Sequence, residues 1–189
     1  MSTSIYAAVR ITQQIFPSRR GNLFPDGFHV APFCAASIEG YLALFEVVDR
    51  QKRFRRLYDR GSLERLLNFH KNTFHTLCYS LNDRGGTPWA LLHGFKLPLK
   101  DDAWAFFADG LIFHPDLAWH LKRLFLSECE RVLRDEEGCV GTSLIATATE
   151  EPLWKYGYVP FGSQTLGIRS RQGPELSARD LRGLRIELR

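Results

Sequence analysis

Three features are missing from this 189-residue sequence, and each absence argues against a class of protein. No apolar run reaches the roughly 18 residues of a membrane-spanning helix, and the N-terminus lacks the basic and apolar segments of a secretory signal. The lack of Cys-x-x-Cys spacing disfavours a structural zinc site, and the lack of Gly-x-Ser-x-Gly disfavours a serine hydrolase. We therefore expect a soluble, cytoplasmic protein with no membrane contact and no metal site.

Cysteine is scarce, and its spacing gives no disulfide framework. The four cysteines are Cys34, Cys78, Cys129 and Cys139, and Cys129 falls on the apolar face of a predicted helix. Buried, unevenly spaced cysteines are typical of free thiols in a reducing compartment. We expect free thiols.

Neither sign of charge dominates the chain. Lys and Arg number 25 against 21 Asp and Glu, which leaves a net charge of +4 and does not by itself indicate nucleic-acid binding. Basic side chains cluster between residues 50 and 60, and the C-terminal tail is also basic. Either segment fits a solvated surface or a contact with a protein partner. The cluster consists of Arg50, Lys52, Arg53, Arg55, Arg56 and Arg60.

Apolar residues make up 44% of the chain and aromatic residues 13%, including 14 Phe and 4 Trp. Such a composition predicts a real hydrophobic core, and the length suits one domain. We expect an N-terminal segment over residues 1–26, a domain over 27–170 and a basic tail over 171–189.

Apolar residues recur at helical spacing in the first half of the domain. The pattern predicts a helix over residues 38–58, capped by Ser37 and broken near Asp49. It predicts a second helix over residues 62–81, which the turn-forming stretch "NDRGG" ends.

The period then changes from about four residues to two. Residues 87–97 and 103–113 read as two apolar strands of a hairpin. An amphipathic helix over 117–135 follows almost at once, with Glu130 on its polar side. The remaining predicted elements are a strand over 139–149, a short helix with Pro152 in its first turn and a last strand over 158–170.

This order of elements resembles the GNAT superfamily of acyl-CoA-dependent N-acyltransferases. The most similar stretches are "LIFHPD", an apolar strand that ends in x-Pro-x, and "LWKYGYVPFG", a short helix that ends in Gly-Tyr before a strand. The resemblance covers about residues 27–170. It implies an α/β (α+β) fold in a single domain, with a central, mostly antiparallel mixed sheet and helices on both faces.

The resemblance also implies where a cofactor binds. A strand that runs directly into a helix presents unpaired N–H groups and a partial positive charge, which suit the pyrophosphate of acetyl-CoA or another acyl-CoA. The pantetheine arm would pair with the backbone of Leu111, Ile112 and Phe113, where the strand splays from its neighbour.

The sequence departs from the family at this helix start. The family carries a glycine-containing loop there, whereas "PDLAWHLKRLF" has no glycine and places Trp119 and Leu121 at the expected glycine positions. The cationic or titratable side chains of His120, Lys122 and Arg123 would compensate by contacting the phosphates.

Three residues are candidates for proton transfer. Asp109 stands in an apolar strand and fits a base with a raised pKa, or alternatively a bulge or turn residue beside Gly110. His114 fits a base, or an exposed residue at a strand end. Tyr156 is displaced from the position of the family's acid, which Leu153 occupies, and so fits a weak candidate acid or a packing residue.

The resemblance therefore predicts an N-acyltransferase, with acetyl as the expected acyl group, that moves this group from acyl-CoA to an amine acceptor. The alternative is a GNAT-like fold without catalysis that serves as a binding or structural module, for example in a phage particle or a regulatory assembly. Loss of the loop glycines and of the usual tyrosine motivates this alternative.

Overall fold

The structure is a computed structural model that describes part of the chain. The described residues are 2–10, 24–25, 27–50, 58–68, 75–99, 103–145, 152–156 and 158–167. Most of the basic cluster of residues 50–60 and the whole tail over 171–189 lie outside these ranges.

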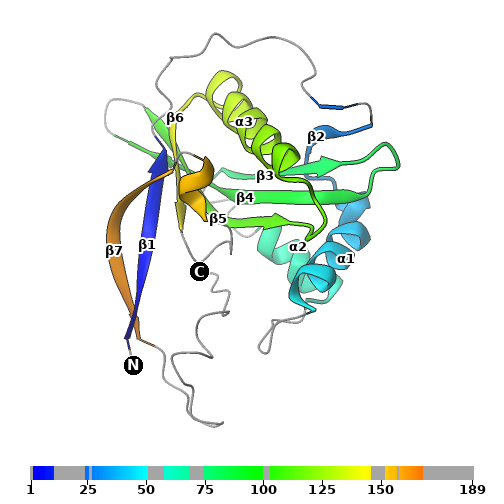
Figure 1. The fold of residues 1–189 in the computed structure, drawn as a ribbon, viewed down its shortest axis with the longest axis horizontal. Coiled ribbons are helices and arrows are strands. Elements are labelled where there is room, and N and C mark those ends of the chain that lie inside the picture. Colours follow the sequence, from blue (N-terminus) through cyan, green and yellow to red (C-terminus); the bar gives the residue numbers. More distant parts are fainter. Residues whose placement is uncertain are drawn as a thin grey trace.

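One seven-stranded sheet, in the order β2-β3-β4-β5-β6-β1-β7, forms the centre of the described molecule (Figure 1). Strands β5 and β6 pair parallel, and the other neighbouring strands for which a register is defined pair antiparallel. The predicted mixed, mostly antiparallel sheet is confirmed. Its strands are β1 (Ser2–Arg10), β2 (His29–Pro32), β3 (Thr76–Asn82), β4 (Pro88–Pro98), β5 (Trp104–Phe113), β6 (Cys139–Ile145) and β7 (Val159–Gly167).

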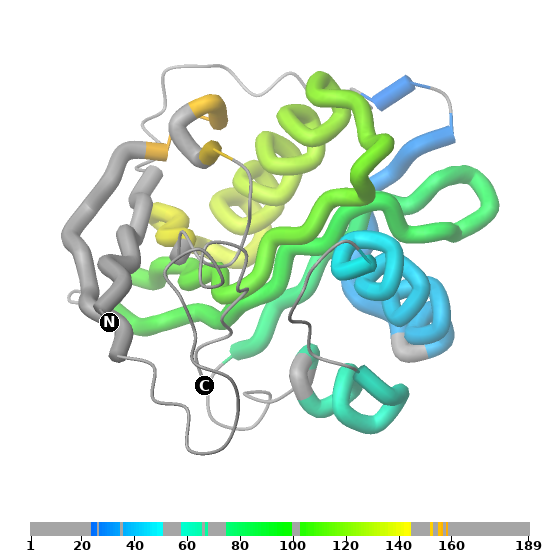
Figure 2. The backbone as a smooth tube through the Cα atoms, turned by 60° about the horizontal axis from the view of Figure 1, so that its bottom comes forward, coloured from blue at the N-terminus to red at the C-terminus, as the bar shows by residue number. Residues whose placement is uncertain are grey.

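Helices cover both faces of the sheet, as predicted. Helices α1 (Ile38–Asp49) and α2 (Arg60–Asn68) lie on one face, and α3 (Trp119–Asp135) lies on the other (Figure 2). Each face has its own apolar cluster, so the sheet separates two half-cores. The α3 side includes Leu92, Phe106, Leu111 and Phe125, and the α1/α2 side includes Tyr41, Phe45, Leu91 and Ile112.

The predicted second helix is wrong in its C-terminal half. Helix α2 ends at Asn68, and the residues from Thr76 to Asn82 form strand β3. Every residue from Cys78 to Asn82 is buried. A strand covered on both faces shows no alternation of polar and apolar residues, which is why its apolar positions passed for a helical pattern.

The turn between β3 and β4 depends on one carboxylate. Asp83 accepts hydrogen bonds from the N–H groups of Gly85 and Thr87, each at 2.9 Å, and from Trp89 Nε1 at 3.1 Å. Gly86 has φ +82, which L side chains rarely adopt. The predicted stop at "NDRGG" is therefore a hairpin turn.

Helix α1 ends at Asp49, where the break was predicted. Ser37 stands at its N-cap position, yet its side chain makes no capping hydrogen bond, because the chain enters through the 3₁₀ turn η1 (Ala35–Ser37). The predicted cap contact is therefore absent from this described helix start.

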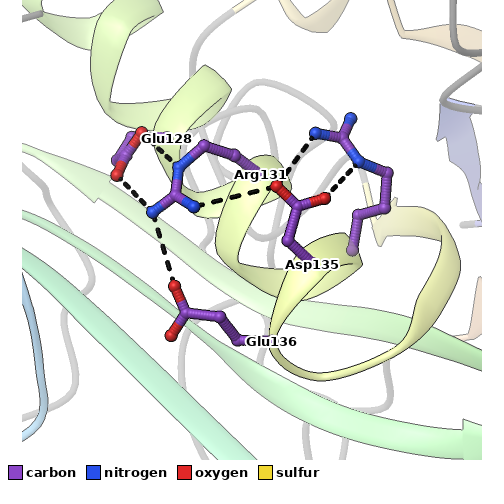
Figure 3. Close-up of polar contacts among 5 residues, drawn as sticks. Glu128, Arg131, Asp135 and Glu136 are labelled. Carbon is purple, nitrogen blue, oxygen red and sulfur yellow. Dashed lines mark hydrogen bonds and ion pairs between the residues drawn. The ribbon is translucent and has the colours of Figure 1, made fainter. Parts of the chain in front are cut away.

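Helix α3 forms where it was predicted, with its start at Trp119, and it packs its apolar side on the sheet. Glu130 was expected on the polar side, but it is buried and accepts a hydrogen bond from Tyr158 Oη at 3.2 Å. Near the C-terminal end of α3, Arg131 contacts the carboxylates of Glu128, Asp135 and Glu136 (Figure 3). That network ties the last turns of α3 together.

Strand β1 comes from the segment that the sequence analysis set apart from the domain. It pairs with both β6 and β7 in the sheet. The boundary at residue 26 stays a prediction. Within the described residues, no helix is both long enough and apolar enough to span a bilayer.

Candidate active site

The described pairing between β5 and β6 covers only the first half of β5, from Trp104↔Cys139 to Ala108↔Leu144. Residues 146–151, which follow β6, lie outside the described ranges. Strand β5 continues to Phe113 while still paired to β4. Along residues 109–113 no described residue pairs with β5 on the side away from β4, and we call this edge of β5 the opening.

Backbone groups of β5 face this opening at alternate residues. The N–H of His114 donates to the carbonyl of Trp89 at 2.8 Å, so the even-numbered residues of this stretch direct their backbone groups to β4. Leu111 and Phe113 then direct theirs toward the opening. Of the three predicted contact residues, Ile112 is the one whose backbone groups pair with β4.

The opening leads to the start of α3. Strand β5 ends at Phe113 and α3 begins at Trp119, and the residue before the helix, Ala118, makes no side-chain capping hydrogen bond. The first helical N–H groups carry a partial positive charge that suits an anion. This is the junction that the sequence predicted.

Two cations lie beside the junction. Lys122 Nζ is 5.3 Å from the centre of the Phe113 ring, and the Arg123 guanidinium is 5.8 Å from the Trp119 ring. His120 is exposed on the same helical turn. The three side chains predicted to contact the phosphates therefore lie at the helix start, and their contact with a phosphate stays a prediction.

Aromatic rings line the rim of the junction. Tyr156, in the short helix η4 (Leu153–Tyr156), stacks on Phe113 at 6.0 Å, and the Trp119 ring lies 5.1 Å from Tyr156. Trp119 is 46% exposed, so its indole borders the opening from the solvent side.

A buried histidine and a buried aspartate meet in the middle of the sheet. The register of β4 and β5 shifts between His93 and Gly94, which makes Asp109 the extra residue of a β-bulge. His93 is 2% exposed and Asp109 is 9% exposed, and His93 Nδ1 lies 2.5 Å from Asp109 Oδ1. This His93–Asp109 pair lies at the level where β6 leaves β5.

Two glycines make room for this pair. A Cβ at Gly110 would lie 2.0 Å from His93 Nε2, so the imidazole rests directly on the α-carbon of that residue. A Cβ at Gly94 would lie 2.2 Å from the Phe107 carbonyl oxygen, so Gly94 allows the close strand approach opposite the bulge.

Cys78 lies opposite His93 in the register of β3 and β4. Burial raises the pKa of its thiol well above the ordinary range, and the charge of Asp109 raises it further. The thiol therefore stays protonated and is no candidate nucleophile.

Comparison of the sequence with protein-family models and with curated protein sequences gives no match. Comparison of the fold with solved structures does. A GNAT family acetyltransferase from Staphylococcus aureus matches with a TM-score of 0.54 and 15% identity, over 77% of this chain and 99% of that one. The aminoglycoside 6'-N-acetyltransferase AAC(6')-Ih from Acinetobacter baumannii matches with a TM-score of 0.53 and 13% identity, over 78% and 100%.

A third match is the Saccharomyces cerevisiae N-myristoyltransferase with bound myristoyl-CoA and inhibitors. Its TM-score is 0.58 at 11% identity, and the match covers 84% of this chain but 46% of the yeast chain. The chain has the GNAT fold.

Within this GNAT fold, the three predicted proton-transfer residues do not converge. Tyr156 contacts Phe113, and Asp109 lies four residues earlier on β5, about 13 Å away at the usual rise of a strand. His114 accepts a hydrogen bond from the Asp116 N–H at 3.2 Å, and its ring lies 4.6 Å from the Trp89 ring. Asp109 alone reaches the centre of the sheet.

His93 is a candidate site residue that the sequence did not predict. Its signal was a histidine inside the apolar run "ALLHGF", directly before a glycine and opposite the only acidic residue of the next strand. Pattern analysis alone could not pair His93 with Asp109, because the bulge shifts the strand register by one residue.

One cavity of this molecule lies away from the opening. It has a volume of about 860 Å³ and is lined by residues of β2 and β3 and by the C-terminal half of α3, including Glu128 and Arg131. It includes none of the residues at the opening. Across the described ranges, no three His, Cys, Asp or Glu side chains group as metal ligands do.

Proposed function

We propose that the protein is an N-acyltransferase that moves an acyl group, most simply acetyl, from acyl-CoA to an amine. One observation carries the proposal. No described residue pairs with β5 along residues 109–113 on the side away from β4, and this edge leads to a helix start without a side-chain cap. A thioester with a phosphate-bearing tail needs a backbone-lined slot for its arm and an anion site for its phosphates. The edge of β5 offers the slot, and the start of α3 offers the anion site.

The helix start takes the pyrophosphate. Its free N–H groups and partial charge attract the anion, and Lys122 and Arg123 add positive charge, with His120 on the same turn. No glycine brings the phosphates close to the backbone here, so these side chains carry more of the binding than a glycine loop would require.

The pantetheine arm follows β5 inward. Leu111 and Phe113 offer it backbone N–H and C=O groups, as the neighbouring strand would. Tyr156 contacts both Trp119 and Phe113 at the outer end of the slot, which supports a packing role for Tyr156 in this proposal.

The acceptor amine reaches the thioester at the inner end of the slot. An amine that attacks a carbonyl carbon loses a proton, so a base must lie near that point. Asp109, the predicted base, lies there with His93.

Isothermal titration with acetyl-CoA tests the binding step. We expect measurable heat for the unchanged chain, and affinity about tenfold weaker or worse for Lys122→Ala with Arg123→Ala, because both cations lie at the helix start. Arg134→Ala, at the far end of the same helix, is the matched control. No heat up to millimolar acetyl-CoA would refute the proposal.

Release of free CoA thiol in the presence of a panel of primary amines tests transfer. The panel should contain an aminoglycoside, a polyamine and a peptide with a free N-terminus. Mass spectrometry should find an acetylated amine for at least one of them. Binding of acetyl-CoA without transfer to any acceptor would favour the alternative below.

One observation favours the alternative, a GNAT-fold binding module without catalysis. The Trp119 indole occupies a position where the resembling family has glycine and contacts Tyr156 at the rim of the opening. Trp119→Gly should then create or strengthen acetyl-CoA binding. If the unchanged chain already binds acetyl-CoA as tightly as the variant, the indole does not block the site.

A further inference from the structure

We propose that Nε2 of His93 is the atom that takes the proton of the attacking amine, and that Asp109 is the positioning residue that holds the imidazole in place. This inference rests on the proposed function and gives that reaction a base that the sequence does not predict. Four observations on the described residues support it.

The first is the contact between Nδ1 and the carboxylate. His93 Nδ1 lies 2.5 Å from Asp109 Oδ1, so the carboxylate is placed to hold the ring through this nitrogen. In a neutral imidazole one ring nitrogen donates and the other accepts, so we take the Nδ1 that faces the carboxylate as the donor. The other ring nitrogen, Nε2, then carries the lone pair of a base.

The second is that Nε2 has no hydrogen-bond partner among the residues that the structure describes. The His93 side chain is 3% exposed, so this nitrogen lies away from bulk solvent. A buried polar atom without a partner is costly and rare in native proteins. Binding of a substrate N–H group would satisfy it.

The third is the direction of the ring. His93 belongs to β4, and its Nε2 lies where a side chain of Gly110, on β5, would begin. Neighbouring strands lie about 4.8 Å apart, so the ring reaches from β4 to β5. Nε2 therefore lies against β5, the strand that borders the opening.

The fourth is the level of the pair along the strand. The last pair between β5 and β6 is Ala108↔Leu144, and Asp109 and Gly110 are the next two residues of β5. The base atom thus lies at the inner end of the proposed slot, where the thioester would arrive.

The reaction balances with these groups. The amine nitrogen attacks the thioester carbonyl, so a C–N bond forms and the C–S bond breaks. The proton of the amine passes to Nε2, while Nδ1–H stays against Asp109. The CoA thiolate leaves, and the imidazolium returns its proton to the thiolate or to water. The products are the amide and the CoA thiol.

Other titratable groups buried on this face must be separated from the pair in any pH study. They are Tyr41 and Asp49 of α1 and Cys78 of β3. Burial raises the pKa of both the Tyr41 hydroxyl and the Cys78 thiol, so neither titrates near neutrality. Asp49→Asn is the control for the remaining carboxylate.

Steady-state acetyl transfer to the best amine of the panel is the test, with acetyl-CoA affinity measured for every variant. We expect His93→Gln to lower kcat by a factor of 100 or more while acetyl-CoA affinity changes less than threefold. Asp109→Asn should lower kcat less, and Asp49→Asn should leave kcat and its pH profile unchanged.

A second measurement determines the tautomer directly in the unchanged protein. Long-range ¹H–¹⁵N spectra of the unchanged protein should show His93 with its proton on Nδ1, and Asp109→Asn should change that tautomer. A proton on Nε2 in the unchanged protein would overturn the inference. So would a His93→Gln variant with full kcat and an unaltered pH profile.

The two proposals fail differently. If the unchanged chain transfers acetyl groups and His93→Gln does so equally well, the base assignment is wrong and the transferase stands. If the unchanged chain neither binds acetyl-CoA nor transfers, both are overturned.

Discussion

At the scale of single residues, the site depends on two glycines, which have no side chain to fill the space beside them. Gly110 has no Cβ, and the space that this leaves is filled by the His93 ring, whose Nε2 would lie 2.0 Å from an added Cβ. Gly94, on the facing strand β4, likewise leaves room for the carbonyl oxygen of Phe107. The geometry of the His93–Asp109 pair therefore depends on both strands.

Gly110→Ala should displace the imidazole. We expect a loss of about 1–3 kcal/mol in the free energy of unfolding, because the added methyl overlaps the ring. Chemical denaturation measures it. The matched control is Gly61→Ala in α2, where the nearest atom is 3.5 Å away and we expect a gain of about 0.4–1 kcal/mol. Equal effects of the two substitutions would contradict the packing described.

Residue patterns could predict Asp109 but not its partner. An acidic residue in an apolar strand is visible in the sequence, and so is the option that it forms a bulge. That His93 contacts it depends on the register of two strands after the bulge, which no local pattern encodes. The aromatic contact of Tyr156 with Phe113 likewise joins residues 43 positions apart, from η4 and β5.

At the scale of elements, the β3–β4 hairpin depends on the Asp83 carboxylate. Hydrogen bonds from Thr87, Trp89 and Gly85 hold the pKa of Asp83 below its ordinary range. A depressed folded pKa contributes stability that is complete above the unfolded pKa, near 4, and is lost as the pH falls through the folded value.

Asp83→Ala should therefore lower the free energy of unfolding by about 1 kcal/mol at pH 7, at the low end for bonds to a charged group because the carboxylate is solvated. The difference from the unchanged protein should shrink below about pH 4. Denaturant titrations at several pH values measure it. Arg84→Ala, an exposed residue of the same turn, should show no such trend, and a constant Asp83 difference down to pH 2 would disprove the role.

A buried hydrogen bond joins helix α3 to Tyr158, the residue before β7. Tyr158 Oη donates to Glu130 Oε1 at 3.2 Å, and both residues are buried. Tyr158→Phe should cost about 1–3 kcal/mol, because it leaves a buried carboxylate with one donor fewer. In a Glu130→Gln background, Tyr158→Phe should cost less. Thermal unfolding of the unchanged protein, the two single variants and the double variant measures both costs.

Among the elements, those with one buried face were the most predictable. Helix α3 has a polar and an apolar side, so its period identifies it, apart from buried Glu130. Strand β3 is buried on both faces over Cys78–Asn82, and its pattern was mistaken for the end of a helix. Burial on two sides removes the alternation that distinguishes a strand.

At the scale of the whole molecule, the two half-cores protect most thiols. Cys78, Cys129 and Cys139 are buried and Cys34 is exposed, and all four are free. Burial raises the pKa of each buried thiol. Ellman's reagent should label one thiol in the native protein and four in denaturant, and Cys34→Ser should abolish the native labelling. Rapid labelling of two or more native thiols would contradict the packing.

The overall architecture could be predicted because the order of elements is distinctive, whereas the site could be predicted only in outline. The strand–helix junction is local in sequence, so "LIFHPD" and the helix after it indicated its place. The opening beside it is a relation between β5 and β6, which are 25 or more residues apart. Its existence depends on where their pairing stops.

The measurement that tests the central claim most directly is an acetyl-CoA titration followed by ¹H–¹⁵N correlation spectra. The amides of Leu111 and Phe113, which face the opening, and of residues 118–120 at the start of α3 should shift together and saturate together. Amides that line the cavity of about 860 Å³ near Arg131 should stay in place. Shifts confined to that cavity, or none at β5 and the start of α3, would contradict the proposed acyl-CoA site.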